Sequence, residues 1–237
     1  MAETWFKFTT RPLNLFTNFW NTILVEQRGV FNEYLICFID YLQFPIEYFL
    51  NIVFEKKLLL LITMKRIGLL SDTHGFLDPK IWDYFSDVDE VWHAGDIGDL
   101  PTLEALEKFK PLRVVYGNID DHRLRAACKE FLRFKIEDVN VLITHIAGRP
   151  GKYAKPALEE LQKNGAPQLF ICGHSHIALA QFDQRFQMLW LNPGACGYKG
   201  FHQVKTIFRF CITGAKIHDL ECIELGLRVS KIPEQIV

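Results

Sequence analysis

The chain of 237 residues lacks an excess of charge of either sign. Its 27 lysines and arginines are offset by 28 aspartates and glutamates, which leaves a formal net charge of −1. A protein that attracts nucleic acid or an anionic membrane through its overall field needs a surplus of positive charge. Composition therefore supports neither partner, although a bound cation could still attract a phosphate group locally.

Closely spaced cysteines are also absent. The six cysteines are scattered singly, form no C-x-x-C pair and lie in apolar, strand-like runs: Cys37, Cys128, Cys172, Cys196, Cys211 and Cys222. This usage is typical of small buried hydrophobes in a reducing compartment. The first residues show no basic flank, apolar core and cleavage site of a secretory signal. We therefore expect a cytoplasmic protein without a disulfide framework.

Long apolar runs are missing as well. A membrane-spanning helix needs roughly 18–20 uninterrupted apolar residues, whereas in residues 1–63 such runs, Tyr34–Ile39 and Tyr48–Phe54 among them, are broken by charged side chains. Two interpretations of this segment stay open. It is an amphipathic extension that lies on a membrane or on the domain, or Met64 is the natural start and the start codon was misassigned. A membrane partner is expected only if the segment is genuine.

From Met64 onward, short apolar runs alternate with helical patterns, which predicts a domain at 64–227 followed by a polar tail at 228–237. Strands are predicted at 66–71, 90–93, 113–116, 141–144 and 169–172, and helices at 100–108 and 155–164. Four antiparallel strands are expected in succession at 179–183, 187–191, 203–213 and 215–224, the last two joined by a hairpin at Thr213-Gly214. This order predicts an α/β fold of two packed β-sheets flanked by helices.

Aspartate, asparagine or histidine follows each of the first five predicted strands. The carboxyl ends of strands are where α/β sheets gather their ligand-binding loops. Carboxylate, amide and imidazole donors without thiolates suit Mn²⁺, Fe²⁺, Zn²⁺ or Ni²⁺. One such cluster arises easily by chance, but five in this order predict a metal site. The candidate ligands are Asp72, His74, Asp96, Asn118, His145, His174 and His176.

The order D-x-H, G-D, G-N, a lone histidine and G-H-x-H resembles the calcineurin-like metallophosphoesterases, and the resemblance covers Met64 to about Leu225. Asn192-Pro193-Gly194 is similar to the sequence that often follows G-H-x-H in the small bacterial and archaeal phosphodiesterases. The resemblance implies a four-layer αββα sandwich. It also implies a metal-dependent phosphodiesterase that hydrolyses a small phosphodiester.

The same resemblance implies two divalent metal ions, with Mn²⁺ as the first expectation and Ni²⁺, Fe²⁺ or Zn²⁺ as alternatives. A hydroxide bridging two such ions would attack phosphorus in line. Each ligand position that the resemblance implies is filled by a residue that can bind a metal. One ion is expected on Asp72, His74, Asp96 and His176, and the other on Asp96, Asn118, His145 and His174.

One position departs from the wider family. Many relatives carry G-N-H-[ED], whose histidine helps the leaving group to depart, and this chain has Ile119 there. Isoleucine transfers no proton, so poor leaving groups should suffer most. We therefore expect activated or aryl phosphodiesters to be hydrolysed faster than alkyl phosphomonoesters.

The alternative function is a protein-binding scaffold with a retained but catalytically poor metal site, because the retromer scaffold subunit of eukaryotes shares this small fold. All expected ligand positions hold competent donors here, which favours the enzyme. The long final strands also allow a homo-oligomer.

We also predict roles for other polar residues near the ligand loops. His93 and His122 either assist catalysis or touch substrate, or they have a structural role, which is the first expectation. We expect Asp99, Asp120 and Asp121 to cap helices or to orient ligands. Arg149 either meets a phosphate or remains a solvated surface side chain.

Overall fold

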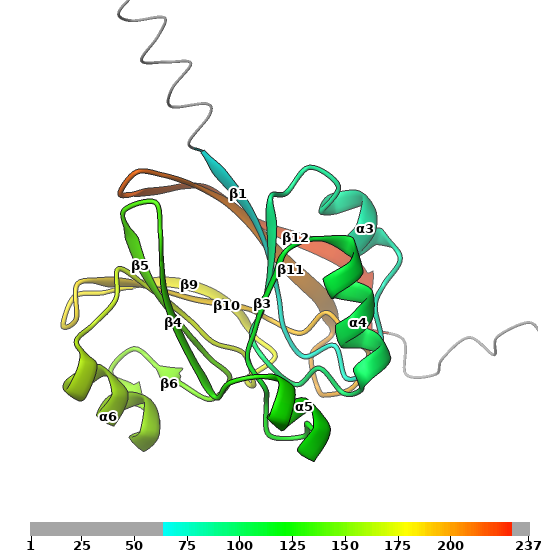
Figure 1. Cartoon of the computed structure of the whole chain (residues 1–237), viewed down its shortest axis with the longest axis horizontal. Coiled ribbons are helices and arrows are strands. Elements are labelled where there is room, and N and C mark those ends of the chain that lie inside the picture. Colours follow the sequence, from blue (N-terminus) through cyan, green and yellow to red (C-terminus); the bar gives the residue numbers. More distant parts are fainter. Residues whose placement is uncertain (1–63, 229–237) are drawn as a thin grey trace, which may run out of the picture. The chain divides into compact units, whose positions relative to one another are not determined.

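The computed structural model of the chain describes residues 64–228, so the expectations for residues 1–63 and for 229–237 lie outside the described residues. Figure 1 shows the arrangement of the elements. In chain order these are β1 (Lys65–Leu70), α3 (Lys80–Tyr84), β2 (Glu90–His93), α4 (Leu100–Phe109), β3 (Leu112–Val114), α5 (His122–Ala127), β4 (Phe131–Ile136), β5 (Val139–Thr144), β6 (Gly148–Arg149), β7 (Lys152–Tyr153), α6 (Lys155–Asn164), β8 (Leu169–Ile171), β9 (Ala178–Asp183), β10 (Met188–Pro193), β11 (Val204–Thr213) and β12 (Lys216–Leu227).

The first sheet has five strands in the order β12-β11-β1-β2-β3. β1, β2 and β3 run parallel, whereas β11 is antiparallel to both β1 and β12. The carboxyl ends of β1, β2 and β3 therefore open at one edge of this sheet.

The second sheet has five strands in the order β4-β5-β8-β10-β9. β5, β8 and β10 are parallel, and the edge strands β4 and β9 are antiparallel to their neighbours. The carboxyl ends of β5 and β8 are adjacent, which brings the two loops that follow them together.

The two sheets pack face to face over one hydrophobic core. Ile67 and Leu69 of β1 lie in the same buried cluster as Val141 and Ile143 of β5. Trp92 is fully buried there, with its ring edge-on to Phe134 and Phe210 from different sheets. Since removing a buried isoleucine or leucine side chain costs about 2–5 kcal/mol, this interface is a large part of what holds the sheets together.

Helices cover the two outer faces. Leu70, on the other face of β1 from Leu69 because strand side chains alternate, packs with Ile81, Phe85 and Leu106 from the region of α3 and α4. On the second sheet, α6 contributes Ala157 and Leu161 to a cluster of its own. The predicted α/β fold of two packed sheets flanked by helices is confirmed.

The expected run of four antiparallel strands is only partly right. β9 pairs with β10 and β11 with β12, and the hairpin at Thr213-Gly214 is present. β10 and β11, however, belong to different sheets, because β10 pairs with β8 while β11 crosses over to pair with β1. The elements β4, α3, α5, β6 and β7 were not predicted.

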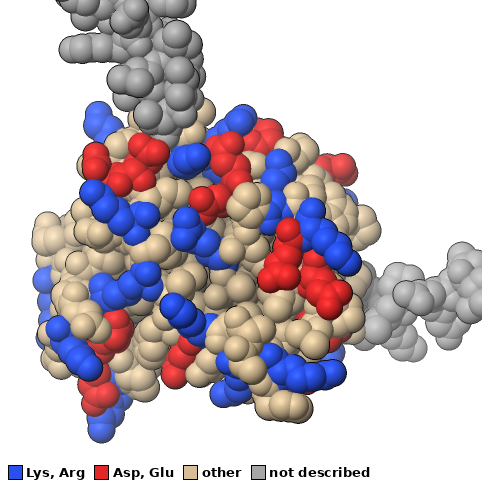
Figure 2. Space-filling view, in the orientation of Figure 1, with Lys and Arg blue, Asp and Glu red and all other residues tan. Residues whose placement is uncertain are grey.

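The surface carries both signs of charge. Lysines and arginines are interspersed with aspartates and glutamates over the face seen in Figure 2. Within residues 64–228, none of the helices combines the length and the apolar character needed to cross a membrane.

Candidate metal centre

The candidate ligands converge from both sheets onto one edge of the sandwich. Four follow β1, β2 and β3, and three follow β5 and β8. Among them are two groups of three residues, and within each group the donor atoms, one from each residue, lie within 4.8 Å of one another. The first group is Asp72, His74 and His176, and the second is Asp72, Asp96 and His145. Residues far apart in the sequence therefore come together as the pattern of strand ends predicts.

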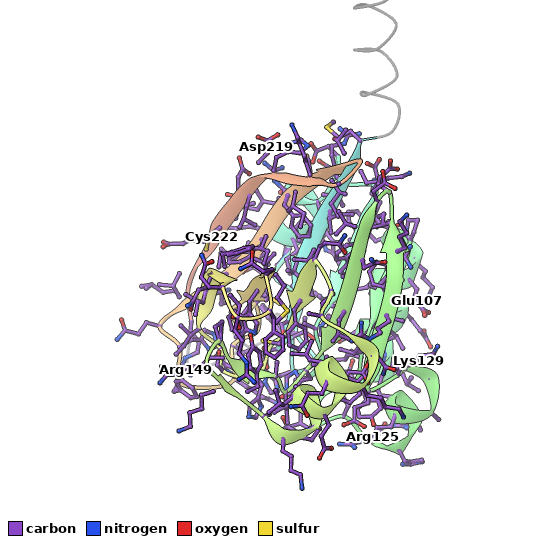
Figure 3. The ribbon with its side chains drawn as sticks, turned by 90° about the vertical axis from the view of Figure 1, so that its left-hand side faces the viewer. Glu107, Arg125, Lys129, Arg149, Asp219 and Cys222 are labelled. Carbon is purple, nitrogen blue, oxygen red and sulfur yellow. The ribbon has the colours of Figure 1, made fainter. Side chains whose placement is uncertain are left out.

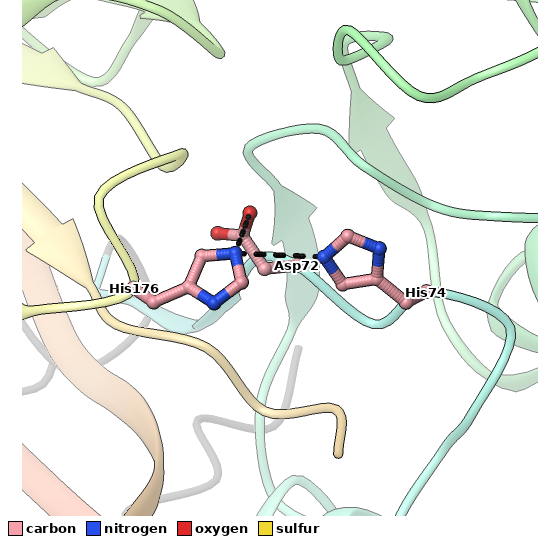
Figure 4. Close-up of side chains that lie close together, drawn as sticks. All are labelled: Asp72, His74 and His176. Atoms are coloured by element: carbon pink, nitrogen blue, oxygen red, sulfur yellow. Dashed lines mark hydrogen bonds and ion pairs between the residues drawn. The ribbon is translucent and has the colours of Figure 1, made fainter. Parts of the chain in front are cut away.

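The first group is drawn in Figure 4. The Nε2 atom of His176 lies 3.1 Å from Oδ1 of Asp72 and 3.5 Å from Nε2 of His74. Nε2 of His74 lies 3.8 Å from Oδ2 of Asp96. Donor atoms that bind one cation at about 2.0–2.2 Å are separated from each other by about 3–3.5 Å, so this spacing fits a shared ion.

The second group centres on His145. Its Nε2 atom lies 3.2 Å from Oδ1 of Asp96 and 3.1 Å from Oδ1 of Asn118. Asp96 thus turns one oxygen toward each group, as a bridging carboxylate would. The ring of His174 stands beside that of His145, with centroids 5.2 Å apart. Within the described part of the chain, neither three-residue group includes His174.

The carboxylate of Asp72 shows that the site fits a cation. Asp72 is fully buried, and its Oδ2 atom accepts hydrogen bonds from the Ser71 hydroxyl and the His174 amide. Its Oδ1 atom has no hydrogen-bond partner within residues 64–228. A buried carboxylate oxygen without a partner is costly, and a cation would remove that cost.

The hydrogen bond of His145 to the backbone fixes its tautomer. Nδ1 lies 2.8 Å from the carbonyl oxygen of Ala94, which can only accept, so Nδ1 carries the proton. In the neutral ring, Nε2 then points its lone pair at Asp96 and Asn118. Such second-atom hydrogen bonds are typical of histidines that bind metals.

Two successive hydrogen bonds through His202 fix the tautomer of His176 in the same way. Nε2 of His202 lies 3.0 Å from the carbonyl oxygen of Gly197 and so donates to it. Its Nδ1 atom is therefore an acceptor, and it lies 3.3 Å from Nδ1 of His176. His176 must donate from Nδ1, which leaves the Nε2 lone pair facing Asp72. Sequence reasoning missed His202, because no motif marks it.

The pKa shifts at the site reflect burial and the pairing of His145 with Asp96. Burial alone would lower the pKa of His145, but the hydrogen bond to Asp96 and the charges of Asp72 and Asp96 raise it above its ordinary value. Burial would raise the pKa of Asp96, and His145 nevertheless holds it below the ordinary value. Burial lowers the pKa of His74 and of His174. A cation among these groups would replace the proton that His145 and Asp96 compete for.

Backbone conformation also marks the site. Eight non-glycine residues between 64 and 228 have positive φ, and five of these are candidate ligands: Asp72, His74, Asp96, His174 and His176. Each such residue costs roughly 1–2 kcal/mol, and backbone strain of this kind gathers at functional sites. The fold holds five ligands in an unfavourable conformation, which favours a role that requires their placement.

Two glycines make room for the carboxylates. A Cβ atom on Gly117 would lie 2.0 Å from Oδ1 of Asp96, and one on Gly173 would lie 2.0 Å from the Ser71 hydroxyl oxygen. Asn192, which is fully buried, then fastens the loop after β8 by donating to the Gly173 carbonyl oxygen and the Ser175 hydroxyl.

The remaining polar residues are largely structural. His93 is fully buried, and burial lowers its pKa to about 4. It accepts from the Gly95 amide at Nδ1 and contacts the Thr73 hydroxyl at Nε2, which joins two ligand loops. Asp120 accepts from the amides of Ile97, Gly98 and Gly117.

Asp99 and Asp121 cap α4 and α5, as expected. His122 begins α5 and is exposed. Arg149 is exposed in β6, and within residues 64–228 no ion pair joins it to a candidate ligand. The Ile119 amide donates to Oδ1 of Asp96, and the residue is 46% exposed.

A second cluster of ligand-type side chains lies at the β11–β12 hairpin. The donor atoms of Cys211, His218 and Asp219 are also within 4.8 Å of one another. Here Nε2 of His218 lies 3.0 Å from the Thr213 hydroxyl and Nδ1 lies 2.9 Å from Oδ2 of Asp219. Both ring nitrogens already have partners.

Comparison with known sequences identifies a family. The sequence profile of the calcineurin-like phosphoesterase superfamily domain matches residues 64–214. A probable metallophosphoesterase of Methanocaldococcus jannaschii is 33% identical over 134 residues, 54% of this chain and 67% of that protein. A probable metallophosphoesterase of Methanothermobacter thermautotrophicus is 30% identical over 138 residues, 54% of this chain and 76% of that protein.

Solved structures share the fold. One, described as a novel archaeal phosphodiesterase, is 27% identical with a TM-score of 0.54 and covers 68% of this chain and 99% of its own. A Thermotoga maritima protein is 25% identical with a TM-score of 0.52, over 68% of this chain and 99% of its own. Vps29 of Entamoeba histolytica, at 17% identity and a TM-score of 0.54 over 68% and 98%, is alike in fold.

Proposed function

Because the chain belongs to the calcineurin-like phosphoesterase superfamily, and is therefore a metal-dependent phosphoesterase, we propose that its substrates are small phosphodiesters and that it works with two divalent cations. The observation that carries this proposal is the buried Oδ1 atom of Asp72, which has no hydrogen-bond partner among residues 64–228 and faces both donor groups. The likeness to an archaeal phosphodiesterase supports the choice of diesters.

One cation would be held by Asp72, His74, Asp96 and His176, and the other by Asp96, Asn118, His145 and His174. Mn²⁺ is the metal we propose first, and Fe²⁺, Zn²⁺ and Ni²⁺ suit the same donors. When bound, such cations supply Lewis acidity, which brings the pKa of a water toward neutrality and neutralises charge on phosphate oxygens.

The chain itself supplies orientation. The Ala94 carbonyl oxygen and His202 hold the lone pairs of His145 and His176 toward the carboxylates. Asp96 is held by the Ile119 amide with its two oxygens directed at different groups. Ile119 offers no proton to a leaving group, so we expect preference for esters whose leaving group departs without protonation.

The test is hydrolysis of bis-p-nitrophenyl phosphate by the full chain, stripped of metal and then supplied with Mn²⁺. We expect metal-dependent turnover that falls on the order of a hundredfold or more in Asp96→Asn, because one group that stabilises charge at the centre is lost. Asp138→Asn, the same change at an exposed hairpin residue, should keep full activity. p-Nitrophenyl phosphate should be the poorer substrate.

Two results would count against the proposal. Equal turnover by Asp96→Asn and the unchanged protein would show that the Asp96 carboxylate is not needed for hydrolysis. A folded protein that binds two equivalents of metal and turns over no phosphoester would favour the scaffold, for which the likeness to Vps29 offers the fold alone.

A further inference from the structure

A hollow of about 180 Å³ borders the candidate metal centre on the side of Asn118 and His145, which form part of its wall. Pockets that enclose a whole drug-sized ligand usually measure about 300–1,000 Å³, and a water molecule occupies about 30 Å³. The hollow therefore has room for one ring of a substrate whose remainder lies outside it.

The rest of the wall is largely apolar and partly aromatic. It is lined by Tyr116 from the segment after β3, Phe131 from β4, Ile146 from the loop after β5 and Pro156 from the start of α6. Ile146 is 41% exposed, although it directly follows the candidate ligand His145. Contiguous apolar surface that is rimmed by polar residues is typical of ligand-binding grooves.

The two charged residues of the hollow offset each other. The guanidinium of Arg125 lies 4.8 Å from the centroid of the Tyr116 ring, and its N–H groups donate to the carbonyl oxygens of Gly117, Asn118 and Asp120. The Tyr116 hydroxyl donates to Glu130 at 3.1 Å. Figure 3 shows Arg125 and Lys129 on neighbouring parts of this end of the molecule. With one cation and one anion on its wall, the hollow favours an uncharged group over a second phosphate.

We propose that this hollow binds an uncharged aromatic ring carried by one ester group of the substrate, so that the enzyme acts on aromatic phosphodiesters. The inference rests on the proposed function, because only a phosphorus atom held at the centre places such a ring beside Asn118 and His145. Ile146 and Tyr116 are then residues that determine specificity.

Binding tests this without turnover. Phenylphosphonate and methylphosphonate, whose carbon–phosphorus bonds are not hydrolysed, are titrated calorimetrically into the Mn²⁺-loaded full chain. We expect phenylphosphonate to bind about tenfold more tightly, because only its ring reaches the hollow. The phosphonate analogue of thymidine 5′-monophosphate, in which a carbon–phosphorus bond replaces the ester bond, is the third ligand. Binding as tight as that of phenylphosphonate assigns the ring to a nucleobase, and weaker binding assigns it to a ring next to phosphorus.

Two variants locate the ring. Ile146→Trp places a large side chain in the hollow at an exposed position and should abolish the preference for phenylphosphonate while methylphosphonate still binds. Ile177→Trp is the matched control, because Ile177 is also exposed, also follows a candidate ligand and does not line the hollow. It should keep the tenfold preference.

The outcomes separate this inference from the proposed function. Equal affinity for both phosphonates, or a preference that survives in Ile146→Trp, overturns the inference even if bis-p-nitrophenyl phosphate is hydrolysed. A protein that hydrolyses the diester and binds neither phosphonate overturns it too. Absence of both binding and turnover overturns the proposed function and the inference with it.

Discussion

Two regions of this molecule gather side chains that bind metals, and they differ in what surrounds those side chains. At the candidate metal centre, Asp72 is fully buried and one of its oxygens has no partner among the described residues. At the β11–β12 hairpin, the Cys211–His218–Asp219 cluster is partly exposed, and His218 already contacts Thr213 and Asp219. Figure 3 shows Asp219 at the end of the molecule away from Arg125.

Backbone strain separates the two regions as well. Asp219 is the one member of the hairpin cluster with positive φ, whereas five of the candidate ligands at the centre have it. A strained residue at a hairpin is explained by the turn, but strain at five converging residues calls for a common reason. Proximity of donors is therefore a weak sign of a metal site, and unsatisfied burial with strain is a stronger one.

Asp72→Asn should break this comparison most strongly. At a Mn²⁺ concentration a hundredfold above Kd, the ion should stabilise the unchanged protein by about 2.7 kcal/mol, a rise in Tm of roughly 5–10 °C for a domain of this size. In the variant we expect the part of that rise that comes from the ion on Asp72 to vanish, while the ion on Asp96, Asn118, His145 and His174 still stabilises the fold. Without metal, its Tm should exceed that of the unchanged protein, because an uncompensated buried carboxylate is gone and asparagine tolerates positive φ. Thermal unfolding with and without Mn²⁺ measures both. An equal Mn²⁺ shift in both proteins would contradict the assignment.

His202→Leu should have the next largest effect. It removes the acceptor that holds His176 in the tautomer with a free Nε2 lone pair. Loss of such a partner typically weakens metal binding by about 10–100-fold. His202→Asn keeps an acceptor near the same place and should recover most of the affinity. Calorimetric Mn²⁺ titrations check this, and identical affinities for the leucine and asparagine variants would show that His202 only fills space.

Cys211→Ser and Asp219→Asn should have the smallest effects. Both sites lie at the hairpin, partly or fully exposed, where substitutions usually change stability by less than about 0.5 kcal/mol. We expect an unchanged Mn²⁺ stoichiometry and an unchanged Mn²⁺ shift in Tm. If either variant lost an equivalent of bound metal, the distinction between the two regions would fail.

The sequence predicted those elements that have a signal within a few neighbouring residues. Apolar runs followed by Asp, Asn or His predicted β1, β2, β3, β5 and β8 and the loops after them, because strand ends and turn residues are local signals. The strand Phe131–Ile136 was missed although polar Arg133 and Lys135 alternate with apolar Phe134 and Ile136, so a signal for it was present. The pairing of β11 with β1 in the other sheet has no local sequence signal, since it depends on which edge of β1 is free.

The features of the candidate site also divide into those that the sequence predicts and those that depend on the fold. The residue types at the candidate ligand positions could be read from short motifs. Their shared strain, the hydrogen bond through His202 and the Asp72 Oδ1 atom that has no hydrogen-bond partner among residues 64–228 depend instead on contacts across the fold. His202 lies 26 residues beyond His176 and comes beside it only when the loop before β11 folds back. The wall of the hollow is likewise assembled from separate elements, and nothing in the spacing of Tyr116, Phe131 and Ile146 predicts that they meet.

The candidate ligands belong to loops of two different sheets, and this has a consequence for how the protein is made. His74 and His176, whose Nε2 atoms come within 3.5 Å, are 102 residues apart in the chain. Contacts of such long range form late in folding, because closing a long loop costs entropy before the contact repays it. A metal ion held by these contacts should therefore slow unfolding more than it speeds folding.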